Sequence, residues 1–270
     1  LPALAMTANG AAGETKQEME SVLGREIGTL NKELSAYADD LPATDAARLR
    51  AANGIWINAK KDFKASASFA ADLKTYYRAE LKEKPFGPAV IREINAFVKK
   101  NTDGMIPEIL DRMNAEAVMY LVNALGFDAK WARPYEKNDV EKGVFTAYNG
   151  TKRTVKLMRS SEGTYLENDK ALGMVKDYEG HQYAFVALLP KEGVDVYDLL
   201  ESLDAETLGS LLSNKKYGTV HAALPKFTVE YGDDLVPTLG DMGMVTATNA
   251  NKADFSGMGV CKDGRLYIET

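Results

Sequence analysis

The sequence predicts an α+β fold, with helices in its first third and strands beyond. The first third of the 270 residues carries apolar side chains at helical spacing. Residues 117–127 are almost all apolar, which is typical of a strand covered on both faces. Later runs of β-prone residues are separated by hairpin signals. Because helices and strands do not alternate regularly, we expect one α+β domain and not a doubly wound parallel sheet.

The composition is that of an ordinary globular protein, with 45% hydrophobic and 27% charged residues. No apolar run approaches the ~18 residues that a membrane-spanning helix needs. The net charge is −6 without a clustered basic face, which disfavours binding to nucleic acid or to an anionic membrane. Cys261 is the single cysteine, so an intrachain disulfide is excluded. One cysteine fits a cytoplasmic protein and also a secreted one with a large core.

Several helices are expected before residue 117. One spans Gly13–Gly24, with Thr15 as its N-cap and Gly24 as its C-terminal stop. Others are indicated over residues 27–37, 69–77 and 90–98 by the apolar spacing. Gly54–Asn58 is a candidate short strand. Residues 1–10 have the character of the end of a buried helix, and no basic leader or cleavage site of a signal peptide is visible in them.

The second half favours strands with two short helices between them. Asn149-Gly150 predicts a hairpin within 145–158, and Glu179-Gly180 predicts another between 173–177 and 183–189. Asp195 and Asp204 are expected to cap the two helices. Further predictions are strands at Thr219–Ala223 and Phe227–Tyr231, a helix at Asp233–Leu239 and an interrupted strand at Leu266–Thr270.

Residues for catalysis or metal binding are scarce. His181 and His221 are the only histidines, and neither has a second ligand at metal spacing. The patterns HExxH, CxxC and GxGxxG and the phosphate-binding loop are absent. Ser256 lacks the preceding glycine of a nucleophile elbow. We therefore predict no enzymatic activity, no metal and no cofactor.

Four weaker signals have simpler structural interpretations. Ser213-Asn-Lys-Lys216 matches the S-x-x-K pattern of penicillin-recognising enzymes, but no S-D-N or K-T-G pattern accompanies it. Asp233-Asp234 suits a solvated helix start. Cys261, beside Lys262 and Arg265, is interpreted as a loop thiol without a role. The glycosylation sequon at Asn149 is accounted for by the hairpin turn.

Three sequence blocks carry a family resemblance. They are LVNALGFDAKW at Leu121–Trp131, LPKF at Leu224–Phe227 and KADFSGM at Lys252–Met258. In this order and spacing, together with residues 3–15 and 93–106, the chain resembles the serpins. The resemblance implies N-terminal helices packed on a large mixed β-sheet, with further smaller sheets. It also implies that residues 1–270 form a single serpin-like domain that is incomplete at both ends. The domain would lack its final strands and the exposed loop that a protease cleaves, called the bait loop below.

The resemblance implies a function based on conformational change. In serpins a protease cleaves an exposed loop, the loop inserts into the main sheet as an extra strand, and the acyl-linked protease is trapped. We therefore expect an inhibitor of serine-type, or else cysteine-type, endopeptidases. It would be a monomer, extracellular or at the cell surface, with a cytoplasmic location as the alternative. The alternative functions are a non-inhibitory serpin that acts as a binding or chaperone-like protein, and an unrelated enzyme that uses Ser213 and Lys216.

The resemblance also assigns roles to individual residues. Asn123 matches the polar residue that holds the central strands together before the sheet opens. Trp131 and Lys226 match the top of the sheet, where the loop first inserts, and Lys226 would pair there with an acidic hinge residue outside this sequence. The structural alternatives are a core amide, a buried tryptophan and a surface lysine. Gly126 replaces the usual aromatic residue, which predicts a weaker strand and easier opening.

Overall fold

A computed structural model describes residues 1–41, 47–262 and 264–269. The chain divides into two compact units. The first comprises residues 1–42, 49–127 and 232–270, and the second comprises residues 43–48 and 128–231. The expectation of a single domain over residues 1–270 stays a prediction.

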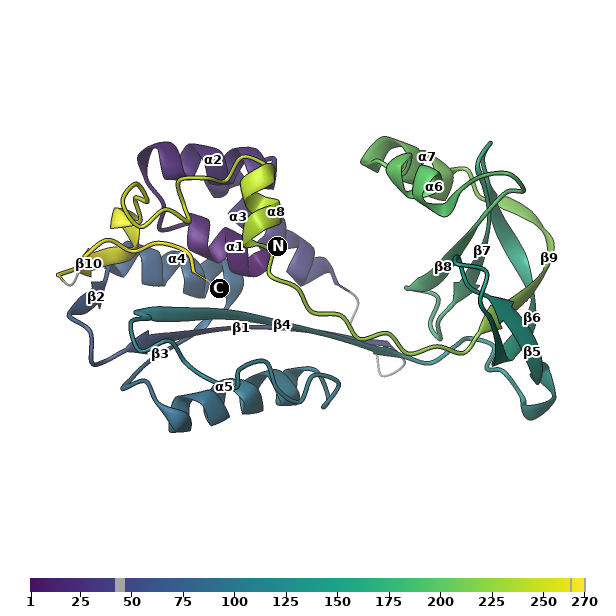
Figure 1. The fold of residues 1–270 in the computed structure, drawn as a ribbon, viewed down its shortest axis with the longest axis horizontal. Coiled ribbons are helices and arrows are strands. Elements are labelled where there is room, and N and C mark those ends of the chain that lie inside the picture. The colour runs from purple at the N-terminus through teal and green to yellow at the C-terminus, as the bar shows by residue number, and fades with distance from the viewer. Residues whose placement is uncertain (42–46, 263, 270) are drawn as a thin grey trace. The chain divides into compact units, whose positions relative to one another are not determined.

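The first unit contains six of the α-helices (Figure 1). They are α1 (Pro2–Ala8), α2 (Gly13–Leu23), α3 (Ile27–Asp40), α4 (Ala67–Tyr77), α5 (Pro88–Asn101) and α8 (Val236–Asp241). The helical predictions over residues 1–10, 13–24, 27–37, 69–77 and 90–98 are thereby confirmed. Gly24 ends α2 in the left-handed conformation with φ 71°, as predicted.

Thr15, however, does not cap α2. The helix begins at Gly13, after Ala12, and Thr15 lies inside it with 1% of its surface exposed. Its hydroxyl accepts a hydrogen bond from the backbone N–H of Asp254 at 3.0 Å and contacts the hydroxyl of Thr246 at 3.1 Å. The partners lie more than 200 residues away in the sequence, so local spacing could not identify this role.

The first unit is built on the sheet β3-β1-β4, with strands at Glu80–Lys84, Ala47–Asn58 and Met119–Ala129. Helix α5 covers one face, and the helical layer containing α1 and α4 covers the other (Figure 1). Along β4, Met119 and Leu121 pack into the cluster around α1–α4, while Val122 and Ala124 pack against α5. The predicted strand and its cover on both faces are confirmed, but among the described strands β4 lies at the end of the order and not at the expected central position. Strand β1 begins earlier than the predicted Gly54.

A second, small sheet in this unit pairs β2 (Phe63–Ala65) with β10 (Gly259–Cys261) in antiparallel register. Cys261 therefore lies in a strand, and the expectation of a loop thiol is wrong. It is opposite Phe63 and packs against the helical cluster. The short helical turn η2 (Ser256–Met258) precedes β10.

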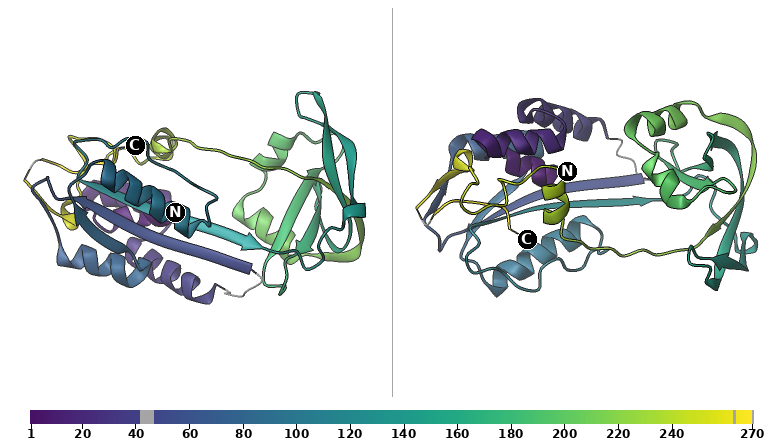
Figure 2. Two further views of the ribbon diagram at one scale, coloured as in Figure 1. Left: turned by 90° about the horizontal axis from the view of Figure 1, so that it is seen from below. Right: turned by 45° about the horizontal axis from the view of Figure 1, so that its top comes forward.

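The second unit is an antiparallel sheet with two helices (Figure 2). Its strands are β5 (Val140–Thr146), β6 (Lys152–Glu167), β7 (Ala171–Asp177), β8 (Ala184–Pro190) and β9 (Lys216–Pro225), in the order β5-β6-β7-β8 with β9 also paired to β6. The turn η1 (Lys137–Asp139) precedes β5. Both predicted hairpins are confirmed, with Gly150 at φ 78° and Gly180 at φ 86° in the turns.

The two predicted caps in the second unit are confirmed. The Asp195 carboxylate accepts from the Tyr197 N–H at the start of α6 (Val196–Glu201), and Asp204 accepts from the Thr207 N–H at the start of α7 (Ala205–Ser213). The bond to the Thr207 N–H holds the pKa of Asp204 below its ordinary value. Each carboxylate satisfies a helix donor that has no partner within the helix.

The strand predicted at Phe227–Tyr231 is not formed, because residues 226–235 belong to no strand or helix. The side chains of Phe227, Val229 and Tyr231 are 59%, 75% and 84% exposed. Residues 266–269 form no strand either, although the Ile268 N–H donates to the Ala247 carbonyl at 2.8 Å, and Thr270 lies outside the described residues. Helix α8 begins at Val236 and not at the predicted Asp233. A β-prone segment becomes a strand only where another strand supplies hydrogen bonds.

Within the described parts of the chain, no helix has both the length and the apolar character required to cross a lipid bilayer.

The segment after α8 is anchored to α2 by one carboxylate. Oε2 of Glu18 accepts hydrogen bonds from the backbone N–H groups of Val245 and Thr246 at 2.8 and 2.6 Å and from the Thr246 hydroxyl at 3.0 Å. Hydrogen bonds to a charged acceptor contribute more than neutral ones. This contact joins residues that are more than 220 positions apart in the chain.

We expect Glu18→Ala to lower the free energy of unfolding by about 2 kcal/mol, because it leaves these donors without their charged acceptor. Urea unfolding of the two proteins measures the change. Glu14→Ala, which removes an exposed carboxylate from the same helix, is the control. Equal losses in the two variants would contradict the anchoring role of Glu18.

Glu167, at the end of β6, lies between two lysines. Its carboxylate contacts the ammonium groups of Lys216 at 2.8 Å and of Lys191 at 3.0 Å. Hydrogen bonds from these two lysines lower the pKa of Glu167 from 4.5 to about 2, and the bond from Lys216 has the larger effect. A carboxyl group whose pKa is lowered on folding stabilises the folded state above its unfolded pKa, and this contribution is lost as the pH falls through the folded value.

We therefore expect Glu167→Gln to be less stable than the original protein at pH 7, with a difference that shrinks from about pH 4.5 towards pH 2. The urea unfolding midpoints of the two proteins, measured across this pH range, test whether the difference in stability shrinks there. Glu179→Gln, at an exposed turn of the same unit, should show no such pH-dependent difference. A difference for Glu167→Gln that is constant with pH would refute the role of these ion pairs.

Candidate functional site

Asn123 lies in the middle of β4 and connects it to β1. Its Nδ2 donates to Oδ1 of Asn53 at 2.9 Å. The Asn53 amide in turn donates from its own Nδ2 to the backbone carbonyl of Tyr77, at the end of α4, at 2.7 Å. Two side-chain amides therefore link β4, β1 and α4 through hydrogen bonds.

The phenol of Tyr77 extends this network into the helical layer. It donates to Oδ1 of Asn31 on α3, and Nδ2 of Asn31 donates to Oδ1 of Asn9 at 2.7 Å. Burial raises the pKa of Tyr77 to about 12. Sequence spacing alone does not mark Asn53, Tyr77 or Asn31 as part of the site. Asn53 could have been noticed as an amide inside an apolar strand, whereas Tyr77 and Asn31 gave no such signal.

Gly126 permits close packing between β4 and the end of α5. A Cβ atom at this position would lie 3.0 Å from the carbonyl oxygen of Asn101 and 3.1 Å from the Cα of Thr102. Both atoms belong to the backbone and cannot move aside easily. The glycine therefore allows helix and strand to approach, which is a different role from the weakening that the sequence suggested.

Strand β4 has one strand neighbour among the described residues. In the order β3-β1-β4, one edge of β4 faces β1, and the described residues place no strand on the other. Leu125 and Phe127, near the end of β4, are 59% and 36% exposed. A long strand edge of this kind offers backbone donors and acceptors to any further strand.

Trp131 belongs to the second unit and is enclosed by aromatic rings. Its indole stacks on Tyr178 with centroids 4.5 Å apart and an interplanar angle of 8°. Tyr135 and Phe185 meet it edge to face at 6.3 and 5.8 Å. The backbone also pairs here, because the Ala132 N–H donates to the Asp177 carbonyl at 3.0 Å and the Glu179 N–H donates to the Lys130 carbonyl at 2.7 Å.

Lys226, also in the second unit, follows β9 directly. Its backbone N–H donates to the Lys156 carbonyl at 2.8 Å, while its side chain is exposed. Among the residues that the structure describes, no carboxylate forms an ion pair with it. Because Asn123 belongs to the other unit, the roles inferred for Trp131 and Lys226 at the top of the sheet stay predictions.

The groups considered for catalysis are engaged in other contacts. Nδ1 of His181 lies 3.0 Å from the Asp177 carboxylate, and Nδ1 of His221 lies 3.0 Å from the Ser161 hydroxyl, all on exposed side chains. The Lys216 ammonium is bound to Glu167, which disfavours its use with Ser213 as a nucleophile pair. Within the described ranges, no three histidine, cysteine or acidic side chains gather as a metal site.

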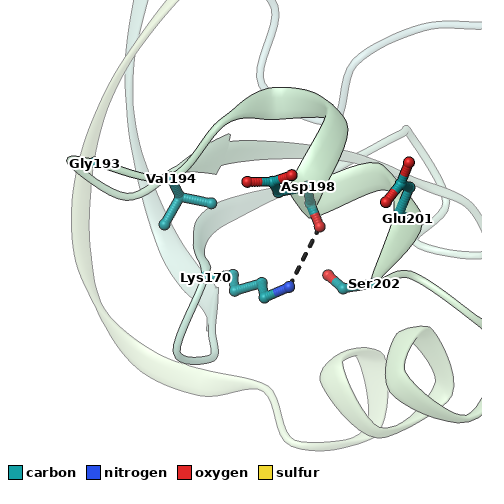
Figure 3. A pocket seen from close by; sticks show the side chains of 6 residues that line it. All are labelled: Lys170, Gly193, Val194, Asp198, Glu201 and Ser202. Atoms are coloured by element: carbon teal, nitrogen blue, oxygen red, sulfur yellow. Dashed lines mark hydrogen bonds between the residues drawn. The ribbon is translucent and has the colours of Figure 1, made fainter.

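A cavity of about 450 Å³ lies beside α6 in the second unit (Figure 3). Lys170 points across it, and its Nζ donates to the backbone carbonyl of Asp198 at 3.3 Å. The Ser202 hydroxyl donates to the Leu199 carbonyl at 2.7 Å. The lysine and the hydroxyl that line the cavity are thus already bonded to backbone carbonyls, so neither is a free donor for a ligand.

Comparison with known proteins agrees with this arrangement. The family model for "Serpin (serine protease inhibitor)" matches residues 1–270. An uncharacterised serpin-like protein of Thermococcus kodakarensis is 32% identical over 95% of this chain, and Serpin B10 of Otolemur garnettii is 31% identical over 96%. The chain spans 61% and 67% of the length of these two relatives.

Solved structures give the same result. The thermophilic serpin tengpin is 40% identical, and the chain superimposes with a TM-score of 0.93 on both its latent and its native state, covering 98% of this chain and 73% and 69% of those structures. Thyroxine-binding globulin in complex with thyroxine follows at 27% identity and a TM-score of 0.85, covering 99% of this chain and 74% of that one. With a family model that matches from the first residue to the last, and with the α+β arrangement shared by these structures, the chain belongs to the serpin family.

Proposed function

We propose that the protein inhibits serine-type or cysteine-type endopeptidases by accepting its own cleaved loop as a further strand beside β4. Membership of a family described as serine protease inhibitors supports this function. The observation that carries the proposal is the superposition of the chain on the serpin tengpin, at a TM-score of 0.93 for both its native and its latent state. The outer edge of β4, with which no described strand pairs while both faces of β4 are covered, is where the further strand would add.

An inserting strand gains free energy at this edge in two ways. Each new backbone hydrogen bond contributes about 1 kcal/mol. The apolar side chains of the inserted strand also gain a covered environment, since α5 and the α1–α4 layer already enclose the faces of the sheet. The sum over several residues favours the inserted state, so the uninserted protein is metastable.

The trapping chemistry belongs to the protease. Its serine or cysteine attacks a carbonyl of the bait loop, the peptide bond breaks, the new amine leaves, and an acyl ester or thioester remains. Insertion must be faster than hydrolysis of this intermediate for the complex to persist. The inhibitor therefore contributes a rapid conformational change and no catalytic group.

The amide pair of Asn123 and Asn53 affects how β4 is held in the sheet during this conformational change. It joins the strand with the open edge to its only described neighbour on the sheet. A movement of β4 away from β1 breaks this bond and leaves two half-buried amides in need of new partners. The pair therefore keeps β4 joined to β1 while a strand adds at the other edge of β4.

A second function is binding of a small molecule on the same scaffold. The solved complex of thyroxine-binding globulin with thyroxine, at a TM-score of 0.85, favours this alternative. An inhibitor and a carrier differ after proteolysis, because only the inhibitor retains the protease covalently. Within the main proposal, we place the protein outside the cell or at its surface, as a monomer whose partner is the target protease.

We expect Asn123→Ala to lower the free energy of unfolding by about 1 kcal/mol and to speed hydrogen exchange of the β4 amides, because Asn53 loses its donor. Urea unfolding and exchange mass spectrometry measure the two effects. Leu125→Ala, at an exposed position on the same strand, should leave exchange in the middle of β4 unchanged. Unaltered exchange in Asn123→Ala would show that the amide pair does not hold the strands.

We expect the whole protein to which these residues belong to form a complex with its target protease that survives denaturing electrophoresis. Trypsin-, chymotrypsin-, elastase-, subtilisin- and papain-type proteases cover the two classes. Blocking the catalytic serine or cysteine beforehand should prevent the complex, because no acyl bond can form. If cleaved protein and fully active protease are the only products with every class, the inhibitor proposal fails and the binding function is favoured.

A further inference from the structure

A buried ion pair lies inside the second unit. Nζ of Lys176 on β7 lies 2.7 Å from Oε1 of Glu162 on β6, and the two residues are 2% and 8% exposed. The other lysine–carboxylate pairs among the described residues of this unit, Lys191 and Lys216 with Glu167, have side chains at least 33% exposed. Charged side chains are rarely buried to this extent, and removal of one partner is strongly destabilising. The buried ammonium group of Lys176 therefore depends on the groups that surround it.

The ammonium group of Lys176 also contacts the aromatic cluster around Trp131. It lies 4.5 Å from the ring centroid of Tyr135 and 5.6 Å from that of Trp131. Both distances are within the range of cation–π attraction, which is strongest for tryptophan and increases when the cation is removed from water. Glu162 fixes the position of the cation, and the cation in turn attracts the two rings.

The position of Trp131 thus depends on side chains of β7 and β6. Tyr178, two residues after Lys176, stacks on the indole, and the adjacent backbone groups of residues 130–132 bond to Asp177 and Glu179. Trp131 follows the last residue of β4, Ala129, by two positions. A contact that holds the indole therefore also restrains the chain immediately beyond β4.

We propose that Lys176, held by Glu162, is the positioning residue that fixes Trp131 and so limits how readily the chain after β4 moves aside for an inserting strand. The effect on insertion rests on the function proposed above. The effect on Trp131 does not, because it concerns contacts inside the second unit alone.

The same unit provides a matched control at its surface. Lys216 pairs with Glu167 and lies 5.9 Å from the ring centroid of Tyr165, but its side chain is 49% exposed. Lys216, Glu167 and Tyr165 therefore combine a lysine, a carboxylate and an aromatic ring, as the buried site does, but at the solvent-exposed surface. Replacement of Lys216 by methionine removes the same charge without disturbing Trp131.

The first experiment observes Trp131 directly by ¹⁹F NMR of protein labelled with 5-fluorotryptophan. The two tryptophans give two resonances, and Trp131→Phe identifies the one from Trp131. We expect Lys176→Met to shift and broaden this resonance and to speed amide exchange at Ala132 and Glu179 about fivefold, the factor that corresponds to one cation–π contact. Lys216→Met should change neither, and the Trp56 resonance should stay in place in every variant.

Two further variants keep the test decisive if Lys176→Met does not fold. The double variant Lys176→Met/Glu162→Gln leaves no unpaired buried charge, so it should fold and still show the shifted Trp131 resonance. Lys176→Arg retains a cation that packs on aromatic rings and should restore the original resonance. An unshifted Trp131 resonance in the double variant overturns the positioning role.

The second experiment measures insertion in the whole protein through the rate at which the covalent protease complex forms. We expect this rate to rise in the double variant and to stay unchanged in Lys216→Met. If the original protein forms complexes and the double variant forms them at the same rate, the link between Lys176 and insertion is wrong. If the original protein forms no complex, the inhibitor function fails, while a shifted Trp131 resonance still supports the positioning of Trp131.

Discussion

In the part of the chain that the structure describes, β4 has a strand partner on one edge and cover on both faces, and this combination constrains the first unit. Helix α5 and the α1–α4 layer enclose the sheet from either side, so a further strand can be added only in the plane of the sheet, at an edge such as that of β4. Gly126 contributes by letting the end of α5 approach the strand closely. An exposed edge is usually a liability for aggregation, and here it is the feature that the proposed function uses.

Buried and half-buried polar groups determine how firmly β4 and the chain beyond it are held. The amides of Asn123 and Asn53 join β4 to β1, and Tyr77 extends the link to the helices. In the second unit, the Glu162–Lys176 pair lies against the rings of Tyr135 and Trp131. Buried polar groups need partners, so each set favours one arrangement and resists movement to another.

Features that depend on neighbouring residues could be predicted from the sequence. The hairpin at Asn149-Gly150, the caps at Asp195 and Asp204, and the left-handed stop at Gly24 all use contacts within a few positions. Residues 117–127 were predictable as a covered strand because a short, uninterrupted apolar run is typical of strands that are buried on both faces. Of the site itself, the sequence indicated Asn123 but none of its partners.

The sequence by itself therefore determined the helices, most strands, the turns and the family, since each rests on local pattern or on blocks of residues in order. Only the tertiary structure decided what long-range partners each residue has. Thr15 bonds to Thr246 and Asp254 instead of capping its helix, and Phe227–Tyr231 forms no strand despite its β-prone residues. The reason is that a hydrogen bond or a buried ion pair between distant residues depends on how the chain packs, and no spacing along the sequence records that packing.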